Sequence, residues 1–313
     1  MLNSFTDRNL DGWNTVVAYP VVPFRRGVPD YASFHKNAEY LIARNRLDGG
    51  RPRVLGFGGG SLIHHLSAEE QLCLVDQLCE TAGDRAIVVS GVVPNPLGPA
   101  AELLERQMRL ARRPDAFLLL PVNGIANPEG IYRELLRFCN EQGRRHGARF
   151  FLYLRSSAQL GALARVARDC EWVVGVKIGT AASDVRPTLE IMEGRGIAMW
   201  GVGDCCLDGI AQGACGHTSG LATLFAGASD ELNNAYRRGD TAAAREIQDQ
   251  LAGFERIRFL EERAYNYSAV VAAARIAGFD DIDCGDGGPF NAEPPPEIME
   301  HVRCELEKLA RYH

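Results

Sequence analysis

The sequence predicts a (β/α)8 barrel of the TIM type, followed by a C-terminal helical extension. Eight short apolar runs alternate with helical patterns over about 225 residues, which is the length of such a barrel. The runs are apolar on both faces, as in strands of a parallel sheet that is buried on both sides. We therefore expect residues 1–225 to form the barrel with the active site, and residues 226–313 to form a helical region.

The eight expected strands are each bounded by glycine, proline or polar residues. In chain order they are Thr15–Val22, Arg53–Phe57, Ala86–Val92, Ala116–Leu120, Arg149–Leu154, Trp172–Ile178, Ile197–Val202 and Ala214–Thr218. A doubly wound sheet is the alternative fold. It would need a glycine fingerprint after its first strand, and Val21–Gly27 contains none.

Helical patterns fill the intervals between these strands. Ser67 and Glu70 have the spacing of a capping box, with the serine as N-cap and the glutamate three residues later. Two further helices begin with a proline, which the first helical turn accepts. The expected barrel helices after Ser67 are Pro99–Ala111, Pro128–Gly143, Leu160–Arg168, Ser183–Met192 and Leu207–Gln212. The expected C-terminal helices are Asp230–Arg237, Thr241–Ala264, Tyr267–Ala277 and Glu297–Tyr312.

Composition excludes several classes of partner. The chain of 313 residues carries a net charge of −6 without a basic stripe, which argues against a nucleic acid as partner. No apolar run approaches the ~20 residues that span a membrane, and Met1–Trp13 lacks the pattern of a signal peptide. Its nine cysteines include no CxxC pair, as in a protein with reduced thiols. We expect a soluble cytoplasmic protein.

A lysine ends the sixth expected strand, Trp172–Lys177. The active site of a TIM barrel lies at the C-terminal ends of its strands, so Lys177 is the first candidate for chemistry. Desolvation there would lower the pKa of the amine, and a neutral amine attacks a carbonyl to form an imine. The alternative interpretation is a lysine that extends from the strand end into solvent.

Two neighbouring features could assist this lysine. Tyr153 ends the fifth strand and could exchange protons beside Lys177, although it could also be a core aromatic with a solvated hydroxyl. Gly56–Ser61 lacks the spacing of dinucleotide and P-loop fingerprints. Its backbone N–H groups and the Ser61 hydroxyl could hold a carboxylate, unless the segment is only a flexible loop.

Metal and hydrolase chemistry find no support in the sequence. His64 and His65 are adjacent and have no third ligand nearby, which makes a poor metal site. The chain has no G-x-S-x-G motif for a nucleophilic serine. We therefore expect no metal and no cofactor.

Several segments, taken in order, carry a resemblance to a known family. The chain is similar along nearly its whole length to the dihydrodipicolinate synthase / N-acetylneuraminate lyase family of class I aldolases and dehydratases. Val174–Lys177 closely matches the family's V-G-[IV]-K around its imine-forming lysine. The other matching segments are Ala18–Phe24, Gly59–Ser61, Leu66–Glu70, Phe151–Tyr153, Gly203–Asp204, Gly213–Gly216 and Gly288–Pro289.

The resemblance assigns roles to individual residues. It implies that Lys177 forms an imine with a 2-oxo acid and that Tyr153 is the general acid and base. It also implies a homo-oligomer, either a tetramer or a dimer. The expected substrate-binding residues are Gly59, Gly60, Ser61, Arg155, Asn123 and His217.

The chain also departs from the family pattern. Gly59 and Gly60 stand where the family has two threonines, and Asn123 stands where it has a second tyrosine. Arg155 resembles the pattern of the sugar-acid dehydratase branch, where it could pair with a distal carboxylate or hydroxyl. These changes favour a lyase or dehydratase of a 2-oxo-3-deoxy sugar acid, or an aldolase that joins pyruvate to another aldehyde, over dihydrodipicolinate synthase itself.

Two alternatives stay open. A non-catalytic relative that binds a sugar acid or a partner protein would explain the missing threonines and second tyrosine. A metal-dependent aldolase on a similar barrel would need a ligand cluster that the sequence does not show.

Overall fold

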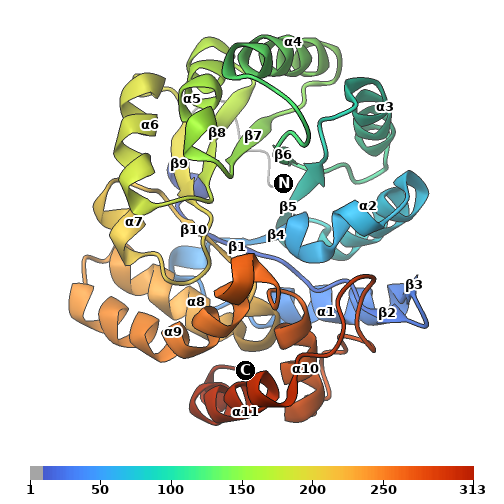
Figure 1. The fold of residues 1–313 in the computed structure, drawn as a ribbon, viewed down its shortest axis with the longest axis vertical. Coiled ribbons are helices and arrows are strands. Elements are labelled where there is room, and N and C mark those ends of the chain that lie inside the picture. Colours follow the sequence, from blue (N-terminus) through green and yellow to red (C-terminus); the bar gives the residue numbers. More distant parts are fainter. Residues whose placement is uncertain (1–9) are drawn as a thin grey trace.

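The computed structural model describes residues 10–313 and confirms the predicted barrel. Eight parallel strands close in the order β1-β10-β9-β8-β7-β6-β5-β4, with helices around them (Figure 1). They are β1 (Val16–Ala18), β4 (Arg53–Phe57), β5 (Ala86–Val92), β6 (Ala116–Leu119), β7 (Phe150–Leu154), β8 (Val173–Ile178), β9 (Ile197–Trp200) and β10 (His217–Ser219). Most of the segment Met1–Trp13, whose sequence lacks the pattern of a signal peptide, lies outside the described residues.

The first and last strands are shorter or later than predicted, for backbone reasons. β1 ends at Ala18 rather than Val22, and Pro20 could not have donated a ladder hydrogen bond beyond it. Gly216 has a φ of +75°, and a Cβ there would lie 2.5 Å from the Trp13 carbonyl. The last strand therefore starts only at His217, after this tight turn.

The helices of the barrel follow the predicted pattern. The capping box is present, because Ser67 N donates to Glu70 Oε2 at 2.8 Å and Glu70 N donates to Ser67 Oγ at 3.2 Å. These helices are α2 (Ala68–Ala82), α3 (Leu97–Met108), α4 (Pro128–His146), α5 (Leu160–Asp169), α6 (Val185–Met192) and α7 (Leu207–Ala211).

One helix and a small hairpin were not anticipated from the sequence. Strands β2 (Phe24–Arg25) and β3 (Val28–Pro29) form the hairpin, and α1 (Tyr31–Ala43) follows it. Asp30 caps this helix by accepting a hydrogen bond from Ser33 N. The helix buries one face against the barrel, as its amphipathic pattern requires.

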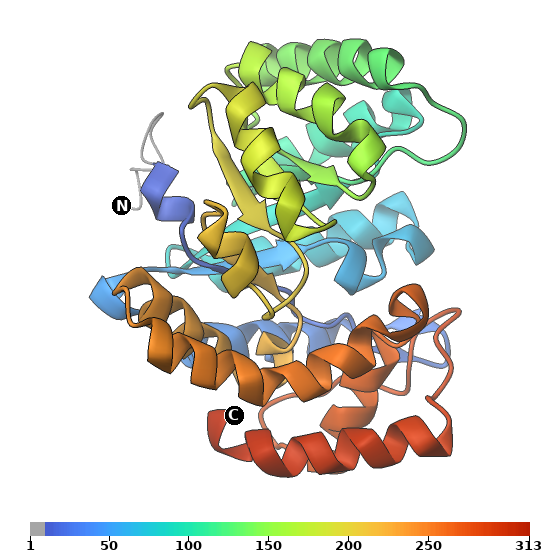
Figure 2. The ribbon, with the colours of Figure 1, turned by 60° about the vertical axis from the view of Figure 1, so that its left-hand side comes forward.

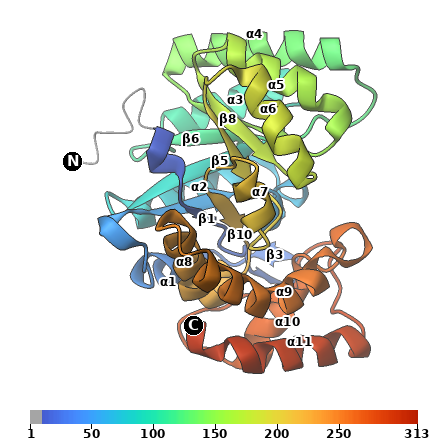
Figure 3. The same cartoon turned by 90° about the vertical axis from the view of Figure 1, so that its left-hand side faces the viewer.

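The C-terminal region is helical, as expected. It contains α8 (Ala222–Arg237), α9 (Thr241–Arg263), α10 (Ser268–Ala277) and α11 (Pro296–Leu309). Figures 2 and 3 show α9, α10 and α11 together along one side of the barrel. The domain boundary predicted after residue 225 falls within α8, and this division stays a prediction.

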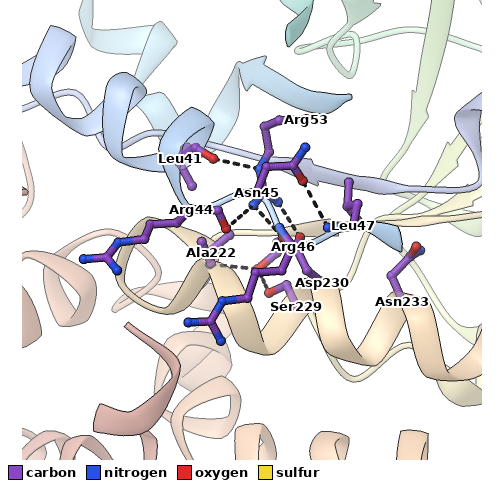
Figure 4. Close-up of polar contacts among 12 residues, drawn as sticks. Leu41, Arg44, Asn45, Arg46, Leu47, Arg53, Ala222, Ser229, Asp230 and Asn233 are labelled. Carbon is purple, nitrogen blue, oxygen red and sulfur yellow. Dashed lines mark hydrogen bonds and ion pairs between the residues drawn. The ribbon is translucent and has the colours of Figure 1, made fainter. Parts of the chain in front are cut away.

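A buried ion pair ties the barrel to α8. Arg53, at the start of β4, donates from Nη2 to Asp230 Oδ2 on α8 at 2.7 Å, and both side chains are 0% exposed. Its Nε also donates to the Leu41 carbonyl at 3.0 Å, while Arg46 N donates to Asp230 at 2.8 Å (Figure 4). The two buried charges are therefore paired and hydrogen-bonded, as buried charges must be.

Among residues 10–313, no helix has both the length and the apolar character that a membrane crossing requires.

Candidate active site

A pocket of about 570 Å³ opens at the carboxyl ends of the barrel strands. This is the face of a TIM barrel on which active sites lie. Strand ends, βα loops and the end of α9 all contribute to its wall. The residues used below are Tyr19, Gly59, Gly60, Asn123, Tyr153, Arg155, Lys177, Arg258, Glu262, Arg263 and Asn266.

Lys177 lies near the end of β8 and is buried, with 7% of its surface exposed. Its Nζ lies 3.4 Å from the Tyr19 hydroxyl, 4.9 Å from the centre of the Tyr19 ring and 4.4 Å from that of Tyr153. Within residues 10–313 no carboxylate forms an ion pair with it. The sequence contains only two other lysines, Lys36 and Lys308, and Lys177 differs from an ordinary surface lysine because it is buried and faces a pocket.

Tyr153 lies beside Lys177, because these two residues are register partners on the adjacent strands β7 and β8. Its hydroxyl accepts hydrogen bonds from Arg155 Nη1 at 3.4 Å and Arg263 Nη1 at 3.3 Å. Burial by itself would raise the pKa of the phenol, but Lys177, Arg263 and Arg155 together lower that pKa to about 7. A pKa lowered in this way suits a group that exchanges protons near neutral pH.

The glycine loop only partly matches the expectation. Gly59 and Gly60 line the pocket. Ser61 is fully buried outside it, where its Oγ accepts from Gly58 N at 3.3 Å and donates to the Pro20 carbonyl at 3.5 Å. The expected contact between the Ser61 hydroxyl and substrate does not fit this placement, because the loop turns that hydroxyl toward the backbone.

Asn123 and Arg155 both line the pocket on exposed loops. The Asn123 backbone is fixed by Asn95, whose side chain accepts from Asn123 N at 3.1 Å and donates to Asn123 O at 2.9 Å. The Asn123 position is therefore defined, although it carries no phenol.

His217 is not part of the pocket. It is fully buried, with Nε2 3.2 Å from Asp204 and Nδ1 3.2 Å from the Tyr236 hydroxyl. Because both ring nitrogens already have protein partners, the expected substrate contact of His217 is not supported by its placement.

Sequence reasoning missed several pocket residues, among them Tyr19, Arg258, Arg263 and Asn266. Tyr19 falls within a matching segment, and its position just after β1 was a usable signal. Arg258 is held by Glu255 at 2.9 Å and by Asn266 at 2.7 Å, all in or after α9. No sequence signal placed the end of α9 over the barrel mouth.

No group of three or more His, Cys, Asp or Glu side chains suited to a metal occurs in the part of the chain that the structure describes. His64 and His65 do line the pocket. Burial, followed by the neighbouring His65, lowers the pKa of His64.

Comparison with known proteins bears on this pocket. The model of the Dihydrodipicolinate synthetase family matches residues 156–286. A 4-hydroxy-tetrahydrodipicolinate synthase of Anaeromyxobacter sp. (strain Fw109-5) is 28% identical, over 82% of this chain and 86% of its own length. Another, from Chelativorans sp. (strain BNC1), is 29% identical over 77% of this chain and 81% of its own length. A crystal structure of dihydrodipicolinate synthase from Bacillus clausii covers 95% of this chain and 98% of its own, with 21% identity and a TM-score of 0.82, which supports the fold.

The chain therefore shares its barrel fold with dihydrodipicolinate synthases and carries a pocket at the carboxyl ends of the barrel strands, where enzymes of this fold have their active sites. The chain is similar to the Dihydrodipicolinate synthetase family over residues 156–286.

Proposed function

We propose that this chain is a class I lyase that acts on a 2-oxo acid through an imine on Lys177, with Tyr153 as general acid and base. The observation that carries the proposal is the pairing of these two side chains on adjacent strands, with Nζ 4.4 Å from the phenol ring. Both face the same pocket at the carboxyl ends of the strands.

The pocket wall suits an anionic substrate. Gly59 and Gly60 offer a backbone surface on which N–H groups can hold the carboxylate next to the reacting carbonyl. Arg155 and Asn123 lie at the exposed side, where they can bind a distal acid or hydroxyl group. The chain as a whole has a net charge of −6, so the positive charge of this pocket is a local feature that suits an anion.

The reaction follows from these placements. The neutral amine of Lys177 adds to the C2 carbonyl, and the carbinolamine loses water to form the imine. The protonated imine withdraws electrons, so an enamine forms when a C3 proton leaves to Tyr153. It also forms when Tyr153 takes the proton of a C4 hydroxyl and the C3–C4 bond breaks to release an aldehyde. The enamine then expels a β-hydroxyl as water, or it takes a proton or an aldehyde at C3.

The residues in which this chain departs from the family bear on the second substrate, the one that reacts with the enamine. The family acts on pyruvate plus an aldehyde, and the curated relatives are named 4-hydroxy-tetrahydrodipicolinate synthases. The glycines at 59 and 60 and the asparagine at 123 support a different partner for pyruvate, or dehydration of a 2-oxo-3-deoxy sugar acid.

Reduction with borohydride in the presence of pyruvate tests the proposal. We expect a mass increase on the peptide with Lys177, and none on those with Lys36 or Lys308, which serve as internal controls. Lys177→Ala should lose both the adduct and turnover by several orders of magnitude. If neither pyruvate nor any of a panel of 2-oxo-3-deoxy acids gives an adduct on Lys177, the proposal is refuted.

A non-catalytic binding protein is the second candidate, supported by the missing threonines and second tyrosine. It predicts ligand affinity without turnover, and Lys177→Ala would then leave the Kd nearly unchanged. Isothermal titration of both forms with a sugar acid separates the two candidates.

We further propose a homo-oligomer, tetramer or dimer, in the cytoplasm. Sedimentation of the purified chain tests the oligomeric state.

A further inference from the structure

Three cationic side chains converge on the phenol of Tyr153. Arg155 arrives from the loop after β7, Arg263 from the end of α9 and Lys177 from β8. Neither arginine forms an ion pair with a carboxylate among residues 10–313. Two guanidinium groups aimed at one oxygen repel each other, so this arrangement favours a negative charge at that oxygen.

The backbone that delivers Arg263 is unusual. Three successive residues, Glu261, Glu262 and Arg263, have φ values of 47°, 56° and 80°. Side chains other than glycine rarely adopt this left-handed region, at a cost of about 1 kcal/mol or more each. The turn lets Arg263 Nη2 donate to the Gly179 carbonyl at 2.9 Å while Nη1 reaches Tyr153.

The direction of the hydrogen bonds also favours a negative charge on the Tyr153 oxygen. A guanidinium group only donates, so the Tyr153 oxygen accepts both arginine hydrogen bonds and neither arginine can take the phenol proton. The other groups that face this corner are Lys177, the Tyr19 hydroxyl beside it and Glu262 on the pocket wall. No carboxylate of the described residues is hydrogen-bonded to Tyr153.

We propose that Arg263 is a positioning residue of the active site, which with Arg155 holds Tyr153 as a phenolate that serves as the base of the reaction. The proposal rests on the proposed function for the identity of the reacting lysine. In its first step a proton leaves Lys177 Nζ for the Tyr153 oxygen, so that an ammonium and a phenolate become a neutral amine and a neutral phenol. The phenol then gives this proton to the carbinolamine hydroxyl, which leaves as water, and the regenerated phenolate takes the C3 proton and can return it to the enamine carbon. One residue then handles the protons, without a second hydroxyl at position 59, 60 or 123.

A tyrosinate absorbance titration of the ligand-free chain tests this directly. We expect one tyrosine to ionise near pH 7, in line with its lowered pKa, and Tyr153→Phe to remove that transition. Arg263→Met should raise the midpoint by about one pH unit or more, a tenfold change in the ionisation constant. Arg263→Lys, which keeps the charge but not the two-pronged contact, should fall between them.

Arg256→Met is the matched control, because Arg256 is exposed on the same helix and loses the same charge. Its midpoint should equal that of the wild type. An Arg263→Met midpoint that also equals the wild type would overturn the proposal, as would the absence of any tyrosine that ionises below about pH 9. If Arg263→Met fails to fold, Arg263→Lys decides by the same criterion.

Enzyme kinetics provide the second readout. The lower limb of the kcat/KM profile should move to higher pH in Arg263→Met, with about a tenfold loss at pH 7 that shrinks at higher pH. A loss that is equal at every pH would contradict the proposal. The borohydride adduct on Lys177 is scored separately, so its absence refutes the imine, while an unshifted tyrosine refutes the role of Arg263.

Discussion

At the scale of single residues, the reactivity of Lys177 and Tyr153 depends on how closely the surrounding backbone approaches them. Gly201 leaves room for the lysine stem, since a Cβ there would lie 2.8 Å from Lys177 Cε. Gly179 does the same for the phenol, because its Cβ would lie 2.4 Å from Tyr153 Cε2 and 3.0 Å from the hydroxyl. Because neither glycine has a Cβ, the side chains of Lys177 and Tyr153 can pack directly against the backbone at these two positions.

Gly179→Ala should displace the Tyr153 ring from Lys177. We expect kcat to fall by about tenfold to a hundredfold, since misplacement by about 1 Å has such effects. Gly161→Ala is the control: a Cβ there meets nothing within 4 Å, so activity and melting temperature should stay near the wild type. Steady-state kinetics of both variants decide the matter, and an unimpaired Gly179→Ala would show that the phenol need not be where the structure places it.

At the scale of the elements, the buried ion pair between Arg53 and Asp230 joins β4 to α8. Removing one partner leaves a buried charge without compensation, which typically costs about 3–5 kcal/mol.

We predict that Asp230→Asn lowers the free energy of unfolding by about 3–5 kcal/mol. Glu231→Gln, which breaks the neighbouring exposed pair with Arg46, should change it by less than about 1 kcal/mol. Arg53→Met with Asp230→Leu should recover much of the loss, because no buried charge remains. Urea titrations give all three values, and a small effect of Asp230→Asn would mean that water reaches Arg53.

At the scale of the whole molecule, a buried polar network joins the barrel to the C-terminal helices. Asp204 follows β9, accepts from His217 on β10, and donates its backbone N–H to Glu255 on α9 at 3.1 Å. Burial opposes ionisation of Asp204, but its hydrogen bond with His217 lowers its pKa to about 2. Burial raises the pKa of Glu255 to about 8, against the effect of Arg258.

This network predicts a pH dependence of stability. The unfolded chain releases the Glu255 proton near pH 4.5, whereas the folded chain retains it up to about pH 8. Stability from this group is complete below pH 4.5 and is lost as pH rises to about 8, because the folded state then binds more protons than the unfolded one.

Glu255→Gln should remove this dependence. We expect the melting temperature of the wild type to fall by several degrees relative to Glu255→Gln between pH 5 and pH 8.5, whereas Glu246→Gln, an exposed change on α9, follows the wild type. If the melting temperatures of Glu255→Gln and Glu246→Gln change with pH in the same way, the raised pKa of Glu255 is refuted.

Local patterns determined the elements and the main candidates. Apolar runs of strand length, the Ser67–Glu70 box and the prolines at helix starts predicted the eight strands and six of the barrel helices, since these signals act within a few residues. The helix Tyr31–Ala43 was missed because its signal, a capping aspartate and a half-buried face, is weak in sequence. Lys177 and Tyr153 were predicted to be neighbours because parallel strands in register bring their ends together.

Tertiary structure alone decided what surrounds that pair. Arg263 is 110 positions from Tyr153 in sequence and reaches it only because the C-terminal end of α9 lies beside the pocket and leaves helical geometry there. Ser61 and His217 look like site residues by position, yet the loop and strand direct their polar atoms into protein contacts. The sequence by itself determined the barrel and its lysine, because periodicity and strand ends are local properties. The positive charge around the Tyr153 phenol comes from side chains on segments far apart in sequence, so only the tertiary structure determines it.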